Sequence, residues 1–429
     1  MFYKQRINDF QNGCGAKNML ELLMPAGNLK KLKTAFHFGA DAVYIGGKAF
    51  SLRAFADNFS NEEIIEAANY AHALGKKVYV TANIFARNDD LDALKNYFVF
   101  LQSAGVDAVL ISDVGLVALC KEVAPKLTVH LSTQANTTNL LAVKFWQSMG
   151  VKRVVLAREL GLEEIKQIHA AVPDMELEAF VHGAMCMSYS GRCLLSTYFS
   201  GRSANKGACI QPCRWGYRIT ETERHASKPL DVEEDERGTY FMNSRDLRLL
   251  EHIPSLAECG IVSLKVEGRM KSEFYVATVA NAYRHAIDEY LQTGKIQNAQ
   301  KYNADLETVA HRTYTDAYFE GDNLDTVCLD EGQSPEKFIF TAVVLECKDG
   351  VATVEMRNRF KSGETLVVLS PDCNDGKTFE VGQITHVFDN AITDDAKLVQ
   401  HIYSFVCPFD LKCGDILLKD NYDICALRK

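Results

Sequence analysis

The sequence predicts an α/β fold, a (β/α)8 TIM-like barrel with a long Cys-rich loop after its seventh strand, joined to a small C-terminal all-β barrel domain. Three observations predict this fold. Short apolar, β-branched runs alternate eight times with longer segments of helical period. Several of these units repeat one local form. After about residue 331 the pattern changes to short strands separated by turn signals.

The expected barrel strands are short and apolar, as in parallel sheets that are buried on both faces. They are Leu20–Met24, Ala42–Ile45, Val78–Ala82, Ala108–Ile111, Val129–Ser132, Arg153–Leu156, Leu177–Val181 and Ser263–Val266. The segments that follow them have the period of helices. They are Leu29–Phe38, Glu62–Leu74, Leu91–Ala104, Gly115–Val123, Leu140–Met149, Leu162–Ala171, Arg245–Cys259 and Glu273–Tyr290. Ser60 and Glu63 have the spacing of a capping box at the start of the second helix.

A weak internal repeat supports the barrel. Gly39, Gly105, Gly150 and Gly260 each close a helical segment and are followed at once by a buried run, as in Gly39-Ala-Asp-Ala-Val-Tyr-Ile. The competing fold is an open, doubly wound sheet. It is disfavoured because no glycine fingerprint for phosphate binding follows the first strand.

This pattern divides the chain into an N-terminal extension (1–18), the barrel with its Cys-rich loop 182–240 (19–330) and the β domain (336–429). The polar border near residues 332–335 is typical of a linker. The strands expected in the β domain are Phe338–Glu346, Val351–Met356, Glu364–Leu369, Phe379–Phe388 and Lys397–Val406.

The composition excludes several classes of function. The chain has 429 residues, with 47 Lys and Arg against 56 Asp and Glu, and a formal net charge of −9. A general polyanion-binding protein would be basic overall, so any contact with nucleic acid must come from a local basic patch. No apolar run reaches the roughly 18 residues of a membrane span. The first 15 residues lack the apolar core of a signal peptide. We therefore expect a cytoplasmic protein that does not contact membranes.

Four of the 13 cysteines gather in the loop after the seventh strand, at Cys186, Cys193, Cys209 and Cys213. Disulfides are disfavoured in a reducing compartment, so clustered thiols indicate a soft metal centre, either zinc or an iron–sulfur cluster. Structural zinc sites commonly use pairs with two-residue spacers, which this set lacks. The loose spacing favours a [4Fe–4S] cluster but leaves zinc open. The simplest alternative is four unrelated loop thiols.

Polar residues at the strand ends are the next candidates, because function in such a barrel lies at the C-terminal face. Glu178, His182 and Glu267 are the candidates for catalysis. A metal-ligand role for His182 is the alternative to a general base, and a hydrogen-bonded structural histidine explains it equally well. Each of these residues could also be a cap or a loop residue that satisfies backbone groups.

Four arginines are candidates for binding substrate. Arg53, Arg158 and Arg269 could hold an anionic small molecule, because guanidinium pairs bidentately with carboxylate. Arg214 lies in the Cys-rich loop, where cations and aromatic residues alternate, and could contact RNA. The structural alternative is that these cations form ion pairs or are solvated.

Long motifs carry a family resemblance. They include Glu178-Ala-Phe-Val-His-Gly-Ala-Met-Cys-Met-Ser-Tyr-Ser-Gly-Arg-Cys, Glu21-Leu-Leu-Met-Pro-Ala-Gly-Asn-Leu and Ser263-Leu-Lys-Val-Glu-Gly-Arg-Met-Lys. On these residues the chain resembles the collagenase-like peptidase family U32 over about residues 19–325, and its β domain resembles the appended barrel of that family. Gly207-Ala-Cys-Ile-Gln-Pro-Cys-Arg-Trp and Asn243-Ser-Arg-Asp-Leu are similar to segments of the members that hydroxylate tRNA.

The resemblance implies a tRNA-modifying hydroxylase that forms 5-hydroxyuridine at the wobble position, depends on prephenate and carries a [4Fe–4S] cluster. It places the cluster ligands at Cys186, Cys193, Cys209 and Cys213. It implies tRNA as a partner, with a paralogous U32 family protein as a second subunit. The alternatives are a collagenase-like peptidase and a hydroxylase of rRNA or of a ubiquinone precursor. Hydrolase motifs give the peptidase little support, because neither Gly-x-Ser-x-Gly nor His-Glu-x-x-His occurs.

Overall fold

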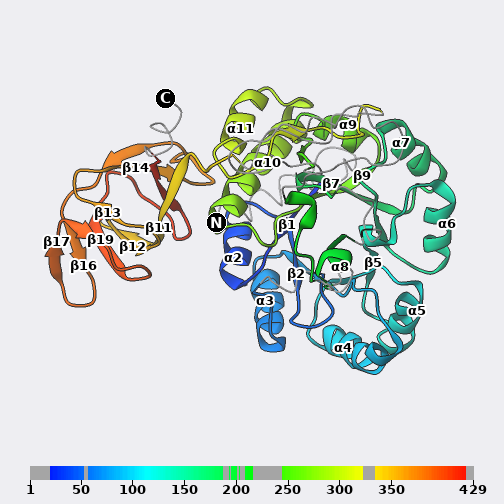
Figure 1. Cartoon of the computed structure of the whole chain (residues 1–429). Helices are drawn as coiled ribbons and strands as arrows, with labels where there is room; N and C mark the ends of the chain where they lie inside the picture. Colours follow the sequence, from blue (N-terminus) through cyan, green and yellow to red (C-terminus); the bar gives the residue numbers. More distant parts are fainter. Residues whose placement is uncertain are drawn as a thin grey trace, which may run out of the picture.

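The structure is a computed structural model that describes residues 20–52, 57–186, 193, 195–200, 202, 208–215, 244–321 and 334–421. Figure 1 shows a ring of strands and helices with a smaller sheet domain beside it. The ring runs from β1 (Glu21–Pro25) to β10 (Tyr314–Thr315), and the sheet domain begins at β11 (Phe338–Lys348). Among the described residues, no helix combines the length and apolar character needed to cross a membrane.

Eight parallel strands form a closed barrel, which confirms the predicted fold class. They are β1, β2 (Ala42–Gly46), β3 (Lys77–Thr81), β4 (Ala108–Ile111), β5 (Val129–Leu131), β6 (Arg153–Val155), β7 (Glu176–Ala184) and β9 (Ile261–Val266). Each strand pairs with the next, and β9 pairs with both β7 and β1, so the ring of strands closes. Closure places the carboxyl ends of all eight strands around one mouth.

Helices surround the barrel (Figure 1). They include α2 (Leu29–His37), α3 (Asn61–Ala73), α4 (Leu91–Ser103), α5 (Val114–Val123), α6 (Leu140–Ser148), α7 (Leu162–Ala171), α10 (Glu273–Thr293) and α11 (Ala299–Leu306). The predicted capping box is confirmed. Ser60 Oγ accepts from the Glu63 backbone N–H at 3.2 Å, and the Glu63 carboxylate accepts from the Ser60 N–H at 2.7 Å. Asn28, Asp113 and Ser272 cap the starts of α2, α5 and α10 with their side chains.

The helix predicted over Arg245–Cys259 is wrong in its first half. Asp246–Arg248 form strand β8, which runs antiparallel to the end of β7, and helix α9 covers only Ile253–Glu258. Pro254 lies in the first turn of α9, where its missing N–H is tolerated, and it would break a helix begun at residue 245. Strand β10 pairs parallel to β8, so these two strands extend the sheet beyond β7.

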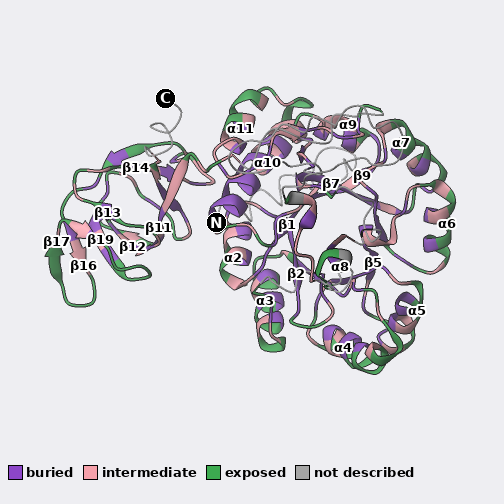
Figure 2. Cartoon of the chain, in the orientation of Figure 1, coloured by how far each residue is buried: buried purple, intermediate pink, exposed green. Residues whose placement is uncertain are grey.

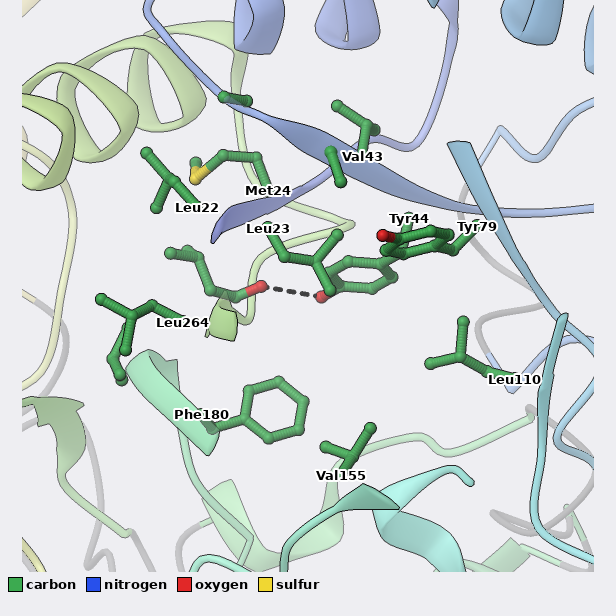
Figure 3. Close-up of a cluster of buried hydrophobic side chains, with 14 of the residues drawn as sticks. Leu22, Leu23, Met24, Val43, Tyr44, Tyr79, Leu110, Val155, Phe180 and Leu264 are labelled. Atoms are coloured by element: carbon green, nitrogen blue, oxygen red, sulfur yellow. Dashed lines mark hydrogen bonds between the residues drawn. The ribbon is translucent and has the colours of Figure 1, made fainter. Parts of the chain in front are cut away.

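Large side chains fill the barrel interior. Figure 3 shows Tyr44, Tyr79, Leu110, Val155 and Phe180 reaching into the space between the strands from β2, β3, β4, β6 and β7. All five are buried in the main core cluster, and each lies in a strand of the barrel. Figure 2 shows the buried residues of the surrounding helices on the sides that face the strands. A filled interior leaves chemistry to the mouth and its loops.

The C-terminal domain is an antiparallel half-barrel in the strand order β15-β14-β20-β11-β12-β19-β16-β17. Its strands after β11 are β12 (Val351–Met356), β14 (Thr365–Leu369), β15 (Thr378–Glu380), β16 (Ile384–His386), β17 (Ala391–Thr393), β19 (Ile402–Val406) and β20 (Ile416–Asp420), and β13 (Phe360–Lys361) pairs separately with β18 (Asp395–Ala396). The sheet has its own core cluster.

Two predictions for this domain are wrong in detail. The strand predicted over Phe379–Phe388 is two strands, β15 and β16, because residues 381–383 around Gly382 are not in a strand. The strand predicted over Lys397–Val406 covers only Ile402–Val406. The central strand β20 was not predicted, because its apolar run of Ile416, Leu417 and Leu418 is too short to show a period.

The two domains meet at the helical layer beside β1. Ile416 of β20 belongs to the same buried cluster as the barrel core. Arg357 Nη2 lies 2.9 Å from Glu273 Oε2 on α10, and His37 Nε2 on α2 lies 3.0 Å from Asp415 Oδ1. These contacts hold the half-barrel against the outer layer of the barrel.

Candidate functional site at the barrel mouth

A layer of charged side chains crosses the barrel interior below the mouth. Glu178 accepts from Lys265 Nζ at 2.8 Å and from Arg153 Nη1 at 3.1 Å. Arg153 also donates to Glu21 Oε1 at 2.5 Å, and Glu21 accepts from the Tyr79 hydroxyl at 2.7 Å. The layer therefore ties together β7, β9, β6, β1 and β3. Glu21, Arg153 and Tyr79 were not predicted as site residues. Glu21 and Arg153 could have been predicted, because each is a charged residue in an otherwise apolar strand.

Glu178 holds a cation rather than exchanging a proton. Burial alone would raise the pKa of this fully buried carboxyl, but Lys265 and Arg153 outweigh burial and hold its pKa below the ordinary range. Both carboxylate oxygens accept from charged donors, so they are occupied. The ammonium of Lys265 is thereby fixed 4.4 Å from the ring centroid of Tyr44 and 5.5 Å from that of Phe180.

Arg158 and Glu267 lie on the mouth side of this layer. Arg158, in the loop after β6, places its Cζ 3.9 Å from the centroid of the Phe180 ring. Glu267, directly after β9, accepts from the Tyr44 hydroxyl at 3.3 Å. Both residues are partly exposed. Contacts through Phe180, Lys265 and Tyr44 thus connect Arg158 to Glu267 and form one floor that carries a cation and a carboxylate.

Arg269 is buried at the mouth and anchors the segment after β2. Its Nη1 donates to Ser51 Oγ at 2.7 Å and to Thr81 Oγ1 at 3.0 Å, and its Nη2 donates to Asn58 Oδ1 at 2.9 Å. A Cβ at Gly46 would lie 2.5 Å from Nη1, so only glycine permits this close approach. The guanidinium of Arg269 therefore holds the wall of the mouth, and an anionic ligand would compete with these bonds.

Two of the predicted arginines cannot be placed against this floor. Arg53 lies outside the described residues, as does the N-terminal extension 1–18. Arg214 belongs to a short 3-10 helix, Pro212–Arg214, but its side chain lies outside the described part of the structure.

His182 faces away from the mouth. A register shift between Phe180 and His182 sets His182 opposite Val266 of β9, whereas Phe180 lies opposite the inward-facing Lys265. The imidazole is enclosed by three tyrosine rings, with centroids 5.4–6.0 Å away. Burial lowers its pKa to about 3. His182 is therefore a neutral group outside the barrel interior.

The four loop cysteines follow directly from β7. Cys186 lies two residues beyond the end of the strand, Cys193 precedes helix α8 (Leu195–Ser200), and Cys213 lies in the 3-10 helix. All four are free thiols, and each is exposed or partly exposed. In Figure 1, α8 is seen against the opening of the barrel. The loop thus starts at the rim of the mouth.

Hydrogen bonds bring separate parts of this loop together. Ser196 Oγ on α8 accepts from the Ile210 N–H at 3.2 Å and donates to the Ala208 carbonyl at 3.4 Å. This places the segment that carries Cys209 beside α8. The Gln211 N–H donates to Cys209 Sγ at 3.4 Å, the type of backbone bond that tunes thiolates around iron–sulfur clusters. Among the described residues, the four sulfur atoms do not form a group of three or more within 4.8 Å of one another. The fit to a soft metal centre therefore depends on the chemistry of four thiols and on the backbone N–H at Cys209.

A closed parallel barrel whose seventh strand leads into four free thiols defines a barrel protein with a thiol-rich loop at its catalytic face. The chain belongs to peptidase family U32. The model of that family matches residues 27–327, and the model of the U32 C-terminal domain matches residues 336–417.

Several relatives cover most of the chain. The tRNA hydroxylation protein P1 of Bacillus subtilis is 42% identical over 379 residues, which cover 87% of this chain and 87% of the relative. The tRNA hydroxylation protein P of Escherichia coli is 41% identical over 404 residues, covering 84% and 88%. A collagenase of Porphyromonas gingivalis is 31% identical over 370 residues, covering 82% and 87%. The family therefore contains relatives named for two different activities.

Proposed function

We propose that this chain is a tRNA hydroxylase that forms 5-hydroxyuridine at the wobble position. The observation that carries the proposal is the thiol-rich loop at the rim of a mouth whose floor presents a cation and a carboxylate. The two relatives named tRNA hydroxylation proteins, at 41% and 42% identity, support this substrate class. An unpaired anticodon base can enter such a mouth more cheaply than a paired one, because it need not be unstacked from a duplex.

Cys186, Cys193, Cys209 and Cys213 would hold a [4Fe–4S] cluster. When bound, such a cluster supplies one-electron chemistry at a potential set by its protein surroundings. The chain supplies the thiolates, and the Gln211 N–H supplies a hydrogen bond to Cys209 Sγ. Ser196 holds the segment of Cys209 against α8.

Arg158 would bind prephenate, the proposed co-substrate, through a carboxylate. Its guanidinium is partly exposed and is oriented by the Phe180 ring, so it remains free to form a bidentate pair. Arg269 would act indirectly, by holding the segment that contains Ser51 and Asn58 in place. Glu267, which accepts from the Tyr44 hydroxyl, is the remaining candidate for proton transfer at this floor. Arg53 and Arg214 stay predictions.

The second candidate function is a peptidase, favoured by the 31% identical relative named collagenase. A thiol protease needs a base beside its nucleophile. His182, only four residues before Cys186, is enclosed by tyrosine rings on the other side of β7 and has a pKa of about 3. This placement weakens the peptidase interpretation.

The test is mass spectrometry of nucleosides from a deletion strain grown without oxygen, in which no other route to 5-hydroxyuridine operates. Deletion should remove 5-hydroxyuridine from tRNA and leave rRNA nucleosides unchanged, and the wild-type gene should restore it. Loss of an rRNA nucleoside instead would contradict the tRNA assignment. Unchanged nucleosides together with gelatin cleavage by the purified protein would support the peptidase.

We also propose where the protein acts and which chain it binds. A tRNA substrate would place the protein in the cytoplasm. A paralogous U32 protein is the proposed second subunit, and co-purification of the two chains at equal amounts from cells would test it. Recovery of this chain without the paralogue, at undiminished activity, would contradict the heteromer.

A further inference from the structure

A second group of metal-binding side chains lies away from the thiol-rich loop. His252, Asp316 and Glu320 each offer one ligand atom, and these atoms lie within 4.8 Å of one another. The His252 Nδ1 is 3.8 Å from Glu320 Oε1. That separation is too long for a direct hydrogen bond, and a shared ion would bridge it after small side-chain rotations.

Packing fixes the two segments that carry these ligands. Phe319 is buried, and its ring centroid lies 4.8 Å from that of His252. The Phe319 carbonyl accepts from the Leu162 N–H at 3.1 Å, at the start of α7. The His252 carbonyl accepts from the Leu256 N–H at 2.9 Å, within the first turn of α9. The ligands therefore stand on packed backbone, as a preformed site requires.

A cavity of about 290 Å³ opens beside the group, and His252 and Asp316 both line it. Asn303 lines the same cavity, and its buried Oδ1 finds no hydrogen-bond partner within the described ranges. Arg248 forms another part of the wall. An ion held by His252 and Asp316 would therefore face open space for water or a further ligand, next to an oxygen acceptor that lacks a donor.

We propose that His252, Asp316 and Glu320 bind one divalent first-row transition ion of the zinc or manganese class at this cavity. One imidazole and two carboxylates form a mixed nitrogen and oxygen donor set, which suits these ions better than calcium or a soft ion. The bound ion would cross-link the segment after β10 to the start of α9. This site is independent of the proposed hydroxylase chemistry, because it shares no residue with the mouth or with the four cysteines.

The experiment uses Mn²⁺ as the probe, since a hard ion binds thiolates weakly and the four cysteines then do not compete. The full chain, treated with a chelator that leaves any cluster intact, is titrated with Mn²⁺ and the free ion is followed by electron paramagnetic resonance. We expect one Mn²⁺ per chain. Asp316→Asn should weaken binding by about tenfold or more. Glu251→Gln changes an acid that lines the same cavity but lies outside the group, and should leave affinity within about threefold.

A second variant guards against misfolding at position 316. Glu320 has a side chain that is 68% exposed, so Glu320→Gln should melt at the wild-type temperature without metal. Mn²⁺ should then raise the melting temperature of the wild type and not that of Glu320→Gln. Absence of Mn²⁺ binding by the wild type at about 1 mM, or equal binding by Asp316→Asn and the wild type, would overturn the proposal.

Discussion

Replacing Glu178 by Gln should destabilise the barrel more than the loss of an exposed ion pair. The Glu178 carboxylate is fully buried and accepts from Lys265 Nζ at 2.8 Å and Arg153 Nη1 at 3.1 Å. Glutamine keeps the shape but removes the charge, so the buried Lys265 Nζ would face an amide in place of a carboxylate. Removing one partner of a buried ion pair costs about 3–5 kcal/mol. We expect the lower end of that range, because Arg153 keeps its contact with Glu21.

The same carboxylate predicts a direction of pH dependence. Its pKa in the folded state lies below the ordinary value. Its stabilising contribution is therefore complete above the unfolded-state pKa of about 4.3 and is lost as the pH falls through the folded-state value. Glu178→Gln lacks this contribution. The difference in unfolding free energy between wild type and variant should be constant near neutral pH and should shrink in acid below about pH 4.

Urea unfolding followed by tryptophan fluorescence measures this effect. The chain has 2 tryptophans, and a Trp215→Phe background leaves Trp146, buried on α6, as the reporter of the barrel. Glu176→Gln is the matched control, because it also removes a carboxylate from Arg153, at 2.9 Å, but from a side chain that is 29% exposed. The control should lose less than about 1 kcal/mol. Equal losses at Glu176 and Glu178 would show that burial does not set the cost of removing the carboxylate.

Three further predictions concern the loop, the mouth and the aromatic surroundings of His182. Cys193→Ala in anaerobically purified protein should lose most of the roughly four irons per chain, whereas Cys373→Ala, an exposed thiol of the C-terminal domain, should keep them; equal iron in both variants would contradict the ligand set. Arg158→Gln should weaken prephenate binding about tenfold in calorimetry without changing the melting temperature, and an unchanged affinity would remove Arg158 from the site. Because burial lowers the pKa of His182 to about 3, the unfolded state takes up a proton below about pH 6.5 that the folded state does not, and stability falls with acid. His182→Phe should reduce this loss between about pH 6.5 and 3, and parallel pH profiles for the variant and the wild type would show that His182 does not cause it.

The barrel could be predicted because its signals are local. Each strand is an apolar run that can be recognised without knowing its partner strand. The strand predicted over Val78–Ala82, for example, is observed as β3 over Lys77–Thr81. Strand β8 could not be predicted in this way, because its three residues become a strand only by pairing with the end of β7. Asp246 in that strand accepts a hydrogen bond at 2.6 Å from Nη2 of Arg312, which lies 66 residues further along the chain.

The candidate site was predictable in its residue types and less so in its geometry. Arg158 and Glu267 were predicted at the mouth because each is a polar residue that follows an apolar strand. The structure places them beyond the C-terminal ends of β6 and β9. The orientation of His182 depends on a one-residue register shift in β7, which leaves no mark in the sequence. The role of Glu178 depends on Arg153 and Lys265, whose distances only the closed barrel sets.

In the proposed function, the four loop cysteines serve tRNA hydroxylation. The most direct test measures 5-hydroxyuridine in tRNA from the deletion strain carrying either Cys186→Ala or the matched exposed-thiol variant Cys373→Ala, at equal protein levels. We predict that Cys373→Ala restores wild-type 5-hydroxyuridine and that Cys186→Ala restores none. Full restoration by Cys186→Ala would contradict a role of the loop cysteines in the reaction.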